Sequence, residues 1–323
     1  SVIIITHKLH EVLAISDRVA ILRKGEYVDT VETKDATEGS LTEMMVGKKV
    51  ELNIERTQPK DTVKRLSVSN LTVYNREGVK VLDDVSFDAY GGEILGIAGI
   101  SGNGQKELLE SIAGLQVTAE GSSIKFYEKG KEDKPLQLIG KTPKKIRDAG
   151  VHLAFVPEDR LGMGLVGSMG MTGNMLLKTY GAGRSFLTEM KGPKKMAEKV
   201  REELEVVTPS INTPVSRLSG GNVQKVLVGR EIAEEPTVLM TAYAVRGLDI
   251  NTSYTIYNLL DEEKRHGVAV VYVGEDLDVL IDLCDRILVL CDGKANGMVD
   301  ARTITKEEVG LLMTNLRKAG AQE

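Results

Sequence analysis

The sequence predicts an α/β fold in which helices cover both faces of a parallel sheet. Three short apolar runs at 237–241, 268–273 and 287–291 have the length of strands, and segments with helical spacing separate them. A fourth run, 93–98, is followed by a glycine loop and then by a helical segment that ends at Gly114. A strand, a glycine loop and a helix in this order can bind phosphate through the backbone.

The composition is that of a globular protein with a packed core. The chain has 323 residues, of which 41% are hydrophobic and 28% are charged. Its 42 Lys and Arg against 47 Asp and Glu give a formal charge of -5, so no basic surface points to nucleic acid or to anionic lipid. No apolar run reaches the ~18–20 residues that a membrane span needs. Cys284 and Cys291 have no neighbouring His or Cys, which predicts buried thiols in a reducing compartment.

An internal repeat organises the chain. The segment Ile5–Gly25 has a counterpart at Val273–Gly293 with the same Asp-Arg pair, and 293 minus 25 gives an offset of 268. We therefore expect residues 1–50 to be the end of a first domain, most of which lies outside this chain, with Val2–Ile5 as an interior strand. Residues 51–65 are predicted to be a linker, although an irregular loop within one domain is an alternative. Residues 66–318 would then form a second domain and 319–323 a tail.

The other elements of the second domain follow in order. Residues 66–90 alternate apolar and polar side chains, which predicts antiparallel strands that form a β lid. A short helix begins at Thr142-Pro143, and 151–156 is another buried strand. Residues 170–216 have helical spacing and predict a helical subdomain. The charged run 261–265 is predicted to be a solvated helix end.

The glycine loop has the spacing G-x-x-x-x-G of a P-loop. Gln105 stands where a lysine would reach the phosphates, and Lys106 stands where a hydroxyl would bind magnesium. Since neighbouring helical positions are ~100° apart, Lys106 cannot replace the missing lysine. The order of the glycines excludes a dinucleotide fingerprint, whereas a plain turn between strand and helix is an alternative. The residues that we assign to nucleotide binding here are Gly99, Ser101, Gly102, Asn103, Gly104, Gln105, Lys106 and Glu107.

A second glycine-containing loop, 218–225, is the most informative motif. The run Leu-Ser-Gly-Gly-Asn-Val-Gln-Lys opens a helix and presents bare amide donors to an anion. It matches the signature loop of ABC-type ATPases, and with the P-loop it makes residues 66–318 resemble the nucleotide-binding domain of an ABC transporter. The resemblance implies catalytic roles for Ser219, Gly220 and Gly221, and a nucleotide-binding role for Asn222.

Further roles follow from the same resemblance. Tyr74 falls where the family stacks an aromatic ring on adenine, although a strand tyrosine that packs on the lid is an equal alternative. Glu158 stands in place of the Q-loop glutamine, in a segment that could also be a surface turn. Asp249 ends the D-loop, and Glu275 stands in place of the switch histidine, where an acid would repel a γ-phosphate.

The site of the second domain is expected to be degenerate. Ala242 occupies the position of the magnesium-binding aspartate, and Tyr243 that of the catalytic glutamate. Neither side chain can hold a metal ion or polarise a water molecule, so we assign no metal ligand and expect weak nucleotide binding with little hydrolysis.

The first domain is expected to carry the competent site. His7 keeps the place of the switch histidine; a lone histidine after a strand is more often structural, but the repeat ties this one to a functional position. In a head-to-tail dimer, the loop at Ser219 would close the ATP site of the first domain, with His7 on its far wall. ATP and Mg²⁺ are expected at that site.

The chain resembles tandem ATPases with one degenerate half and a Pro-Glu-Asp-Arg loop, which power bacterial import of simple sugars and nucleosides. Gln105 favours the nucleoside branch. We expect an ATP-hydrolysing subunit, peripheral on the cytoplasmic face of the cell membrane, that works as an ABC domain dimer with transmembrane permease subunits and, indirectly, a substrate-binding protein. A catalytically inactive nucleotide-binding scaffold or sensor is the alternative, and an ABC ATPase of DNA repair or translation is disfavoured by the acidic balance.

Overall fold

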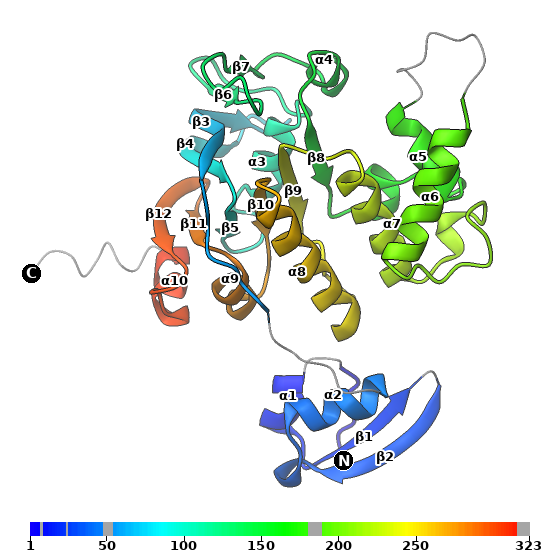
Figure 1. The fold of residues 1–323 in the computed structure, drawn as a ribbon. Coiled ribbons are helices and arrows are strands. Elements are labelled where there is room, and N and C mark those ends of the chain that lie inside the picture. The colour runs from blue at the N-terminus through cyan, green and yellow to red at the C-terminus, as the bar shows by residue number, and fades with distance from the viewer. Residues whose placement is uncertain (7–8, 24, 48–53, 180–188, 315–323) are drawn as a thin grey trace, which may run out of the picture.

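The computed structural model describes residues 1–6, 9–23, 25–47, 54–179 and 189–314, and Figure 1 shows their arrangement. The helices are α1 (Leu9–Ile15), α2 (Glu38–Val46), α3 (Gln105–Ile112), α4 (Pro143–Asp148), α5 (Met171–Thr179), α6 (Lys191–Glu203), α7 (Gly220–Ile232), α8 (Ile250–Arg265), α9 (Leu277–Leu283) and α10 (Lys306–Met313). The strands are β1 (Arg18–Arg23), β2 (Glu26–Glu32), β3 (Val63–Tyr74), β4 (Lys80–Gly91), β5 (Ile94–Ala98), β6 (Ser123–Phe126), β7 (Leu136–Gln137), β8 (Leu153–Val156), β9 (Val238–Ala242), β10 (Ala269–Val273), β11 (Arg286–Cys291) and β12 (Lys294–Asp300). Short 3-10 helices cover Thr33–Asp35 and Val215–Arg217, and a π-helical turn covers Arg160–Gly164.

The centre of the second domain is a six-stranded sheet in the order β12-β11-β5-β10-β9-β8. Its strands pair in parallel except at the edge, where β12 is antiparallel to β11. Every residue of β5, β9 and β10 is buried, as expected for parallel strands that are covered on both faces. The predicted α/β fold and its parallel sheet are confirmed.

The two faces of this sheet carry separate hydrophobic cores, because successive side chains of a strand point to opposite sides. On β5, Leu95 and Ile97 belong to the core that includes α3 and the β lid. Ile94 and Ala98 belong to the other core, together with buried residues of α7, α8 and α9. The glycine loop after β5 therefore leaves the sheet between two well-packed layers.

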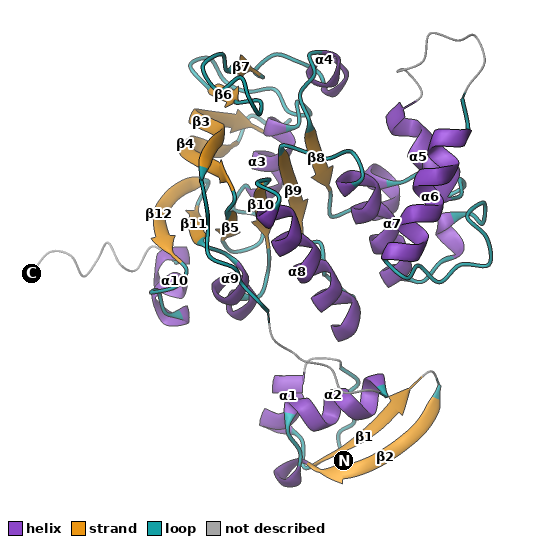
Figure 2. Ribbon diagram, in the orientation of Figure 1, coloured by secondary structure: helices purple, strands orange, loops and turns teal. Residues whose placement is uncertain are grey.

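A second sheet, in the order β4-β3-β6-β7, is antiparallel and forms the predicted lid. In Figure 1 it lies beside β5 and α3. On the opposite side, α5, α6 and α7 form a helical group, and Figure 2 shows only helices and loops in the described residues between β8 and β9. None of the helices in the described ranges has both the length and the apolar composition of a membrane-spanning helix.

The N-terminal elements repeat the C-terminal ones. The starts of α9 and α1 differ by 277 minus 9, and those of β12 and β2 by 294 minus 26; both give 268. Both hairpins have a register shift at the matching place, between Ile21 and Leu22 and between Val289 and Leu290. The first copy has a small core of its own, against which Ile250 of α8 packs.

The predicted strand at Val2–Ile5 is wrong. Residues 1–6 have no regular structure, and Val2, Ile3 and Ile5 are exposed at 88%, 90% and 96%. A strand needs a neighbour to pair its backbone and to cover its side chains, and the described residues place none beside this segment.

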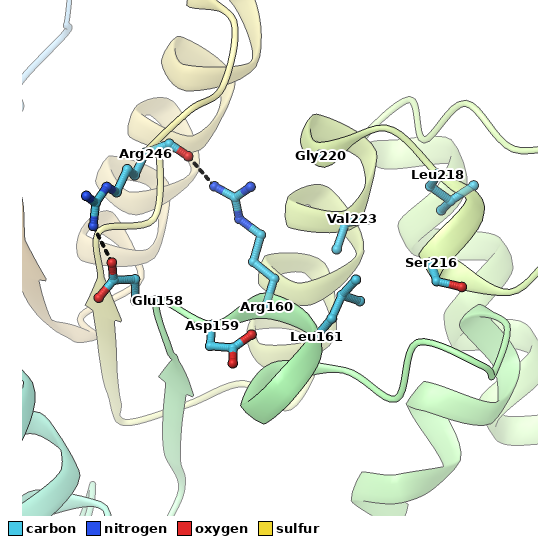
Figure 3. Close-up of a pocket in the computed structure, with 9 residues that line it drawn as sticks. All are labelled: Glu158, Asp159, Arg160, Leu161, Ser216, Leu218, Gly220, Val223 and Arg246. Carbon is cyan, nitrogen blue, oxygen red and sulfur yellow. Dashed lines mark hydrogen bonds and ion pairs between the residues drawn. The ribbon is translucent and has the colours of Figure 1, made fainter.

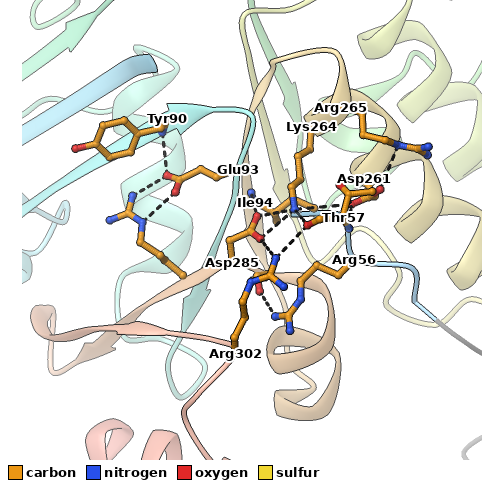
Figure 4. Close-up of polar contacts among 12 residues, drawn as sticks. Arg56, Thr57, Tyr90, Glu93, Ile94, Asp261, Lys264, Arg265, Asp285 and Arg302 are labelled. Carbon is orange, nitrogen blue, oxygen red and sulfur yellow. Dashed lines mark hydrogen bonds and ion pairs between the residues drawn. The ribbon is translucent and has the colours of Figure 1, made fainter. Parts of the chain in front are cut away.

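A buried cluster of charged side chains joins α8 to the start of β11 (Figure 4). Asp261, Lys264 and Asp285 are only 3%, 2% and 4% exposed. Lys264 Nζ lies 2.8 Å from one carboxylate oxygen of Asp285, and Arg302 Nη2 lies 2.8 Å from the other. The prediction of a solvated helix end at 261–265 is therefore wrong for Asp261, Glu263 and Lys264, which are buried. Distant parts of the chain supply partners for the charges of Asp261 and Lys264.

The segment before β3 docks on the same cluster. The backbone N–H and the hydroxyl of Thr57 both donate to Asp261 Oδ1, at 3.1 and 2.9 Å. The Thr57 carbonyl accepts from Lys264 Nζ at 2.6 Å and from Arg302 Nη2 at 3.0 Å. Arg56 donates to two backbone carbonyls at the end of α9. Within the range predicted as a linker, residues 51–53 lie outside the described part, Arg56 and Thr57 are held by the domain, and β3 already begins at Val63.

Candidate functional site

The phosphate loop leaves β5 and enters α3 through two glycines in the left-handed region. Gly102 has φ 93° and Gly104, the residue before α3, has φ 96°. Gln105 is 2% exposed, and its Nε2 donates to the Ile100 carbonyl at 3.1 Å. A Cβ on Gly99 would lie 2.5 Å from this Nε2, so the glycine makes room for the folded-back amide. The side chain in the lysine position thus contacts the loop itself.

We predict that Gly104→Ala destabilises the domain by roughly 2–4 kcal/mol and Gly102→Ala by only about 1 kcal/mol. Both residues have a positive φ, so both changes introduce backbone strain. A Cβ on Gly104 would also lie 2.7 Å from the Val81 carbonyl and 2.5 Å from Leu82, whereas nothing lies within 4 Å of one on Gly102. Urea unfolding of the two variants tests this. Equal losses would show that the contact with β4 does not constrain the loop.

The signature loop opens α7 and is exposed. Ser219 is the N-cap of α7; its hydroxyl accepts from the Asn222 backbone N–H at 3.4 Å and from Asn222 Nδ2 at 2.9 Å. The Asn222 side chain also accepts from the Val207 N–H at 2.9 Å. A Cβ on Gly221 would lie 3.1 Å from Thr252 and 3.5 Å from Asp249. The structure therefore places Asp249, the N-cap of α8, beside the signature loop.

The predicted residues Glu158 and Glu275 lie on either side of Arg246. The Arg246 guanidinium forms ion pairs with Glu158 and, from Nε at 3.2 Å, with Glu275. A pocket of about 450 Å³ extends from here to the start of α7, and Figure 3 shows the side chains that line it. They are Glu158, Asp159, Arg160, Leu161, Ser216, Leu218, Gly220, Val223 and Arg246.

The geometry agrees with the comparison to known families. The family described as ABC transporter matches residues 82–241, a range that begins in β4 and ends in β9. Residues 82–241 form an ABC transporter domain. The family resemblance predicted from the two loops is confirmed.

Curated relatives of this ABC domain match nearly the whole chain. The nucleoside import ATP-binding protein NupA of Lactococcus lactis is 37% identical over 97% of the chain and 60% of the relative. The glucose import ATP-binding protein TsgD13 of Haloferax volcanii is 37% identical over 100% of the chain and 58% of the relative. The xylose import ATP-binding protein XylG of Thermoanaerobacter pseudethanolicus is 35% identical over 95% and 60%. The chain thus spans about three fifths of the length of these relatives.

Solved ABC cassettes share the fold. A dimeric structure of the ATP-binding cassette MJ0796 bound to ADP and Pi has a TM-score of 0.62 at 22% identity, with 74% of this chain and 100% of that one covered. A nucleotide-free ATP-binding cassette has a TM-score of 0.61 at 22% identity, with 78% and 95% covered. The predicted cassette fold is therefore confirmed.

The residues of this ABC domain do not fit a magnesium ion at its own phosphate loop. A second pocket, of about 290 Å³, is lined by Lys106, Glu158, Ala242 and Tyr243, among others. The Lys106 ammonium faces Glu110 at 3.9 Å, in the position where a metal-binding hydroxyl is needed. In the described ranges, no group of three or more His, Cys, Asp or Glu side chains is arranged to hold a metal ion.

Tyr243 lines the same pocket. It has φ 50°, an uncommon conformation for a residue with a side chain. Burial, followed by the nearby charges of Glu158 and Glu275, raises the pKa of its hydroxyl, which therefore stays protonated at neutral pH. A neutral phenol in this place cannot take a proton from water as a carboxylate would.

The remaining predicted residues lie at the edges of the site or outside the described part. Tyr74 is 49% exposed at the end of β3 and pairs with Lys80, one residue before the Val81 carbonyl that approaches Gly104. It is therefore not a core residue of the lid, and its role in stacking on adenine stays a prediction. His7 lies outside the described residues.

Sequence reasoning missed roles for Arg160 and Arg246. The Arg160 guanidinium donates to the Arg246 carbonyl, and burial lowers its pKa. Two acids in places where the family has neutral or basic residues were a usable signal, because two negative charges that face one site favour a cation between them.

Proposed function

We propose that this chain forms one half of a tandem ABC protein that hydrolyses ATP and supplies energy to an importer of a nucleoside or simple sugar. In this proposal, the chain lends its signature loop to the ATP site of a partner cassette. The observation that carries the proposal is an asymmetry. The loop at Ser219 is complete and exposed at the start of α7, whereas the pocket beside Lys106, which follows the chain's own phosphate loop, is lined by Ala242 and Tyr243.

The internal repeat supports the tandem arrangement. In the second copy, β11 pairs with β5 and is buried along almost its whole length. In the first copy, the corresponding strand β1 pairs with β2, and most of its residues are exposed or half-buried. Leu22 of β1 is 66% exposed, whereas its counterpart Leu290 is completely buried. A cassette that supplied a β5-like strand would cover this edge of β1.

The relatives' names support the partners and the class of substrate. The relatives are named as ATP-binding proteins for the import of nucleosides, glucose or xylose, and import across a membrane needs transmembrane permease subunits. We therefore propose a peripheral position on the cytoplasmic face of the membrane, with a substrate-binding protein as an indirect partner. ATP and Mg²⁺ would bind at the partner cassette, with His7 of the first copy at that site.

The exposed amides of the signature loop indicate the role that this chain would have at the partner's ATP site. Ser219, Gly220 and Gly221 would donate to phosphate oxygens from a helix N-terminus, which stabilises negative charge. The Ser219–Asn222 hydrogen bonds fix the hydroxyl that would face this ligand. Its chemistry is charge stabilisation, because Asp249, the carboxylate beside Gly221, already accepts hydrogen bonds from the backbone and hydroxyl of Thr252.

The test compares two purified proteins: residues 1–323, and the protein expressed from its complete reading frame. The chain alone is expected to release phosphate from ATP at less than about 1% of the rate of the complete protein, because its own site lacks a general base and metal ligands. Adding EDTA should abolish the activity of the complete protein. Rapid magnesium-dependent turnover by residues 1–323 would contradict the asymmetry, and absence of turnover in both proteins would favour a scaffold or sensor.

A further inference from the structure

One guanidinium joins the loops after three neighbouring strands. Glu158 follows β8, Arg246 follows β9 and Glu275 follows β10, and these strands are adjacent in the central sheet. Arg246 Nη1 contacts Glu158, whereas Nε contacts Glu275 at 3.2 Å. The planar guanidinium has donors that point in different directions, so a single arginine can hold two carboxylates in fixed places. The middle loop is thereby fastened to both of its neighbours.

A second arginine extends this connection to the signature helix. The Arg160 guanidinium donates to the Arg246 carbonyl, as Figure 3 shows. A Cβ on Gly220 would lie 3.5 Å from Arg160 Nη1, so the same guanidinium lies against the first residue of α7. A cation is unfavourable at a helix N-terminus. The Arg246 carbonyl offsets part of that penalty and fixes where Arg160 lies.

The strength of these ion pairs indicates that they position loops locally. The side chains of Arg246, Glu158 and Glu275 are 56%, 41% and 52% exposed. Exposed ion pairs contribute only about 0–1 kcal/mol each, too little to change the stability of the whole domain. They can still decide whether a loop opens locally, because local opening of loops needs far less free energy than global unfolding.

We propose that Arg246 is a positioning residue that, through Arg160, sets the orientation of the signature loop. The acids that replace the Q-loop glutamine and the switch histidine supply the charge that holds Arg246. Contacts within this chain therefore hold the three loops together, so that α7 is positioned for the partner's ATP. That the loop serves a partner's ATP rests on the proposed function. The series of contacts from Glu158 and Glu275 through Arg246 and Arg160 to α7, which we call the relay, is a property of this chain.

The first test is hydrogen exchange, followed by mass spectrometry, on residues 1–323. Arg246→Ala and the isosteric double variant Glu158→Gln/Glu275→Gln should each speed exchange at least about fivefold in 244–249 and at the Asn222 and Val223 amides. Raising NaCl from 0.1 to 1 M should have the same effect on the unmodified chain, because the screening length falls from about 10 to 3 Å. Arg201→Ala, an exposed arginine on α6, is the control.

Unchanged exchange in the first turn of α7 in both charge variants would overturn the relay. The double variant keeps the shapes of the side chains, so it remains informative if Arg246→Ala folds poorly. A urea midpoint within experimental error of the unmodified chain is expected for the double variant. A large loss of global stability in the double variant would mean that Glu158, Arg246 and Glu275 stabilise the fold and do not position the loop.

The second test is ATP turnover by the protein from the complete reading frame. Arg246→Ala is expected to lower kcat about tenfold and leave KM for ATP unchanged, because the change misplaces a loop without removing a ligand. Arg246→Lys should stay within about twofold of the alanine variant, since an ammonium cannot bridge two carboxylates and keep their geometry. Full activity in the lysine variant would overturn the bridge.

Ser219→Ala, measured in parallel, separates the two proposals. Loss with Ser219→Ala and none with Arg246→Ala overturns the relay alone. No loss with Ser219→Ala overturns the proposed function, whereas hydrogen exchange in residues 1–323 reports on the relay without any turnover.

Discussion

Ser219→Ala is expected to lower ATP hydrolysis by the protein from the complete reading frame at least ~100-fold, whereas Gln105→Ala should change it less than about twofold. The serine hydroxyl stands at the exposed end of α7, where the amides and the helix dipole favour negative charge. Gln105 is buried, and its amide is engaged with the Ile100 carbonyl, so removing it alters only the chain's own loop. Steady-state phosphate release with saturating ATP and Mg²⁺ measures both effects.

A second N-cap provides the matched control for Ser219. Thr305 caps α10, the last described helix, with a hydroxyl that accepts from the Glu308 N–H at 3.3 Å. Thr305→Ala and Ser219→Ala should each cost about 1 kcal/mol of stability, but only the second should stop turnover. Equal loss of activity from Ser219→Ala and Gln105→Ala would contradict the assignment of the signature loop to another site.

The parallel strands and the repeat could be predicted because local signals carry them. Buried parallel strands are continuous apolar runs, and 237–241, 268–273 and 287–291 lie within two residues of the strands β9, β10 and β11. The matching N-caps Thr37 and Thr305 illustrate why the repeat extends to the last helix of each copy, since both make a capping box. The length of an apolar run, a glycine in a loop and a helix cap can each be recognised from a few consecutive residues of the sequence.

The charged contacts could not be predicted because their partners are far apart in the chain. Glu158 and Arg246 are separated by 88 residues, and Thr57 and Asp261 by 204. The run 261–265 has the composition of an exposed helix end, and only the folded positions of Asp285 and Thr57 make burial of Lys264 possible. The segment Val2–Ile5 shows the converse error, since its β-branched residues favour a strand but cannot form one without a neighbour.

Asp285→Ala is expected to be the most destabilising single change outside the site, at about 3–5 kcal/mol. Its carboxylate accepts from Lys264 and Arg302 and from the Ile94 N–H at 2.9 Å. Removing it leaves a lysine that is 2% exposed without its carboxylate, and it frees the backbone at the start of β5. Breaking one partner of a buried charged group is costly because the other charge stays out of water.

Asp278→Ala is the matched control, because it removes an exposed pair from the neighbouring helix. The Asp278 and Lys306 side chains are 61% and 52% exposed and 2.6 Å apart, so their pair should contribute less than about 1 kcal/mol. Urea unfolding at neutral pH compares the stabilities of the two variants. Thr57→Val removes one hydroxyl donor to Asp261, and its loss of stability should lie between theirs, at about 1 kcal/mol. A loss below 1 kcal/mol for Asp285→Ala would mean that water reaches Lys264. The segment at Thr57 would then be loosely held, because the same ammonium donates to the Thr57 carbonyl and fixes the strand that leads from the N-terminal elements into β3.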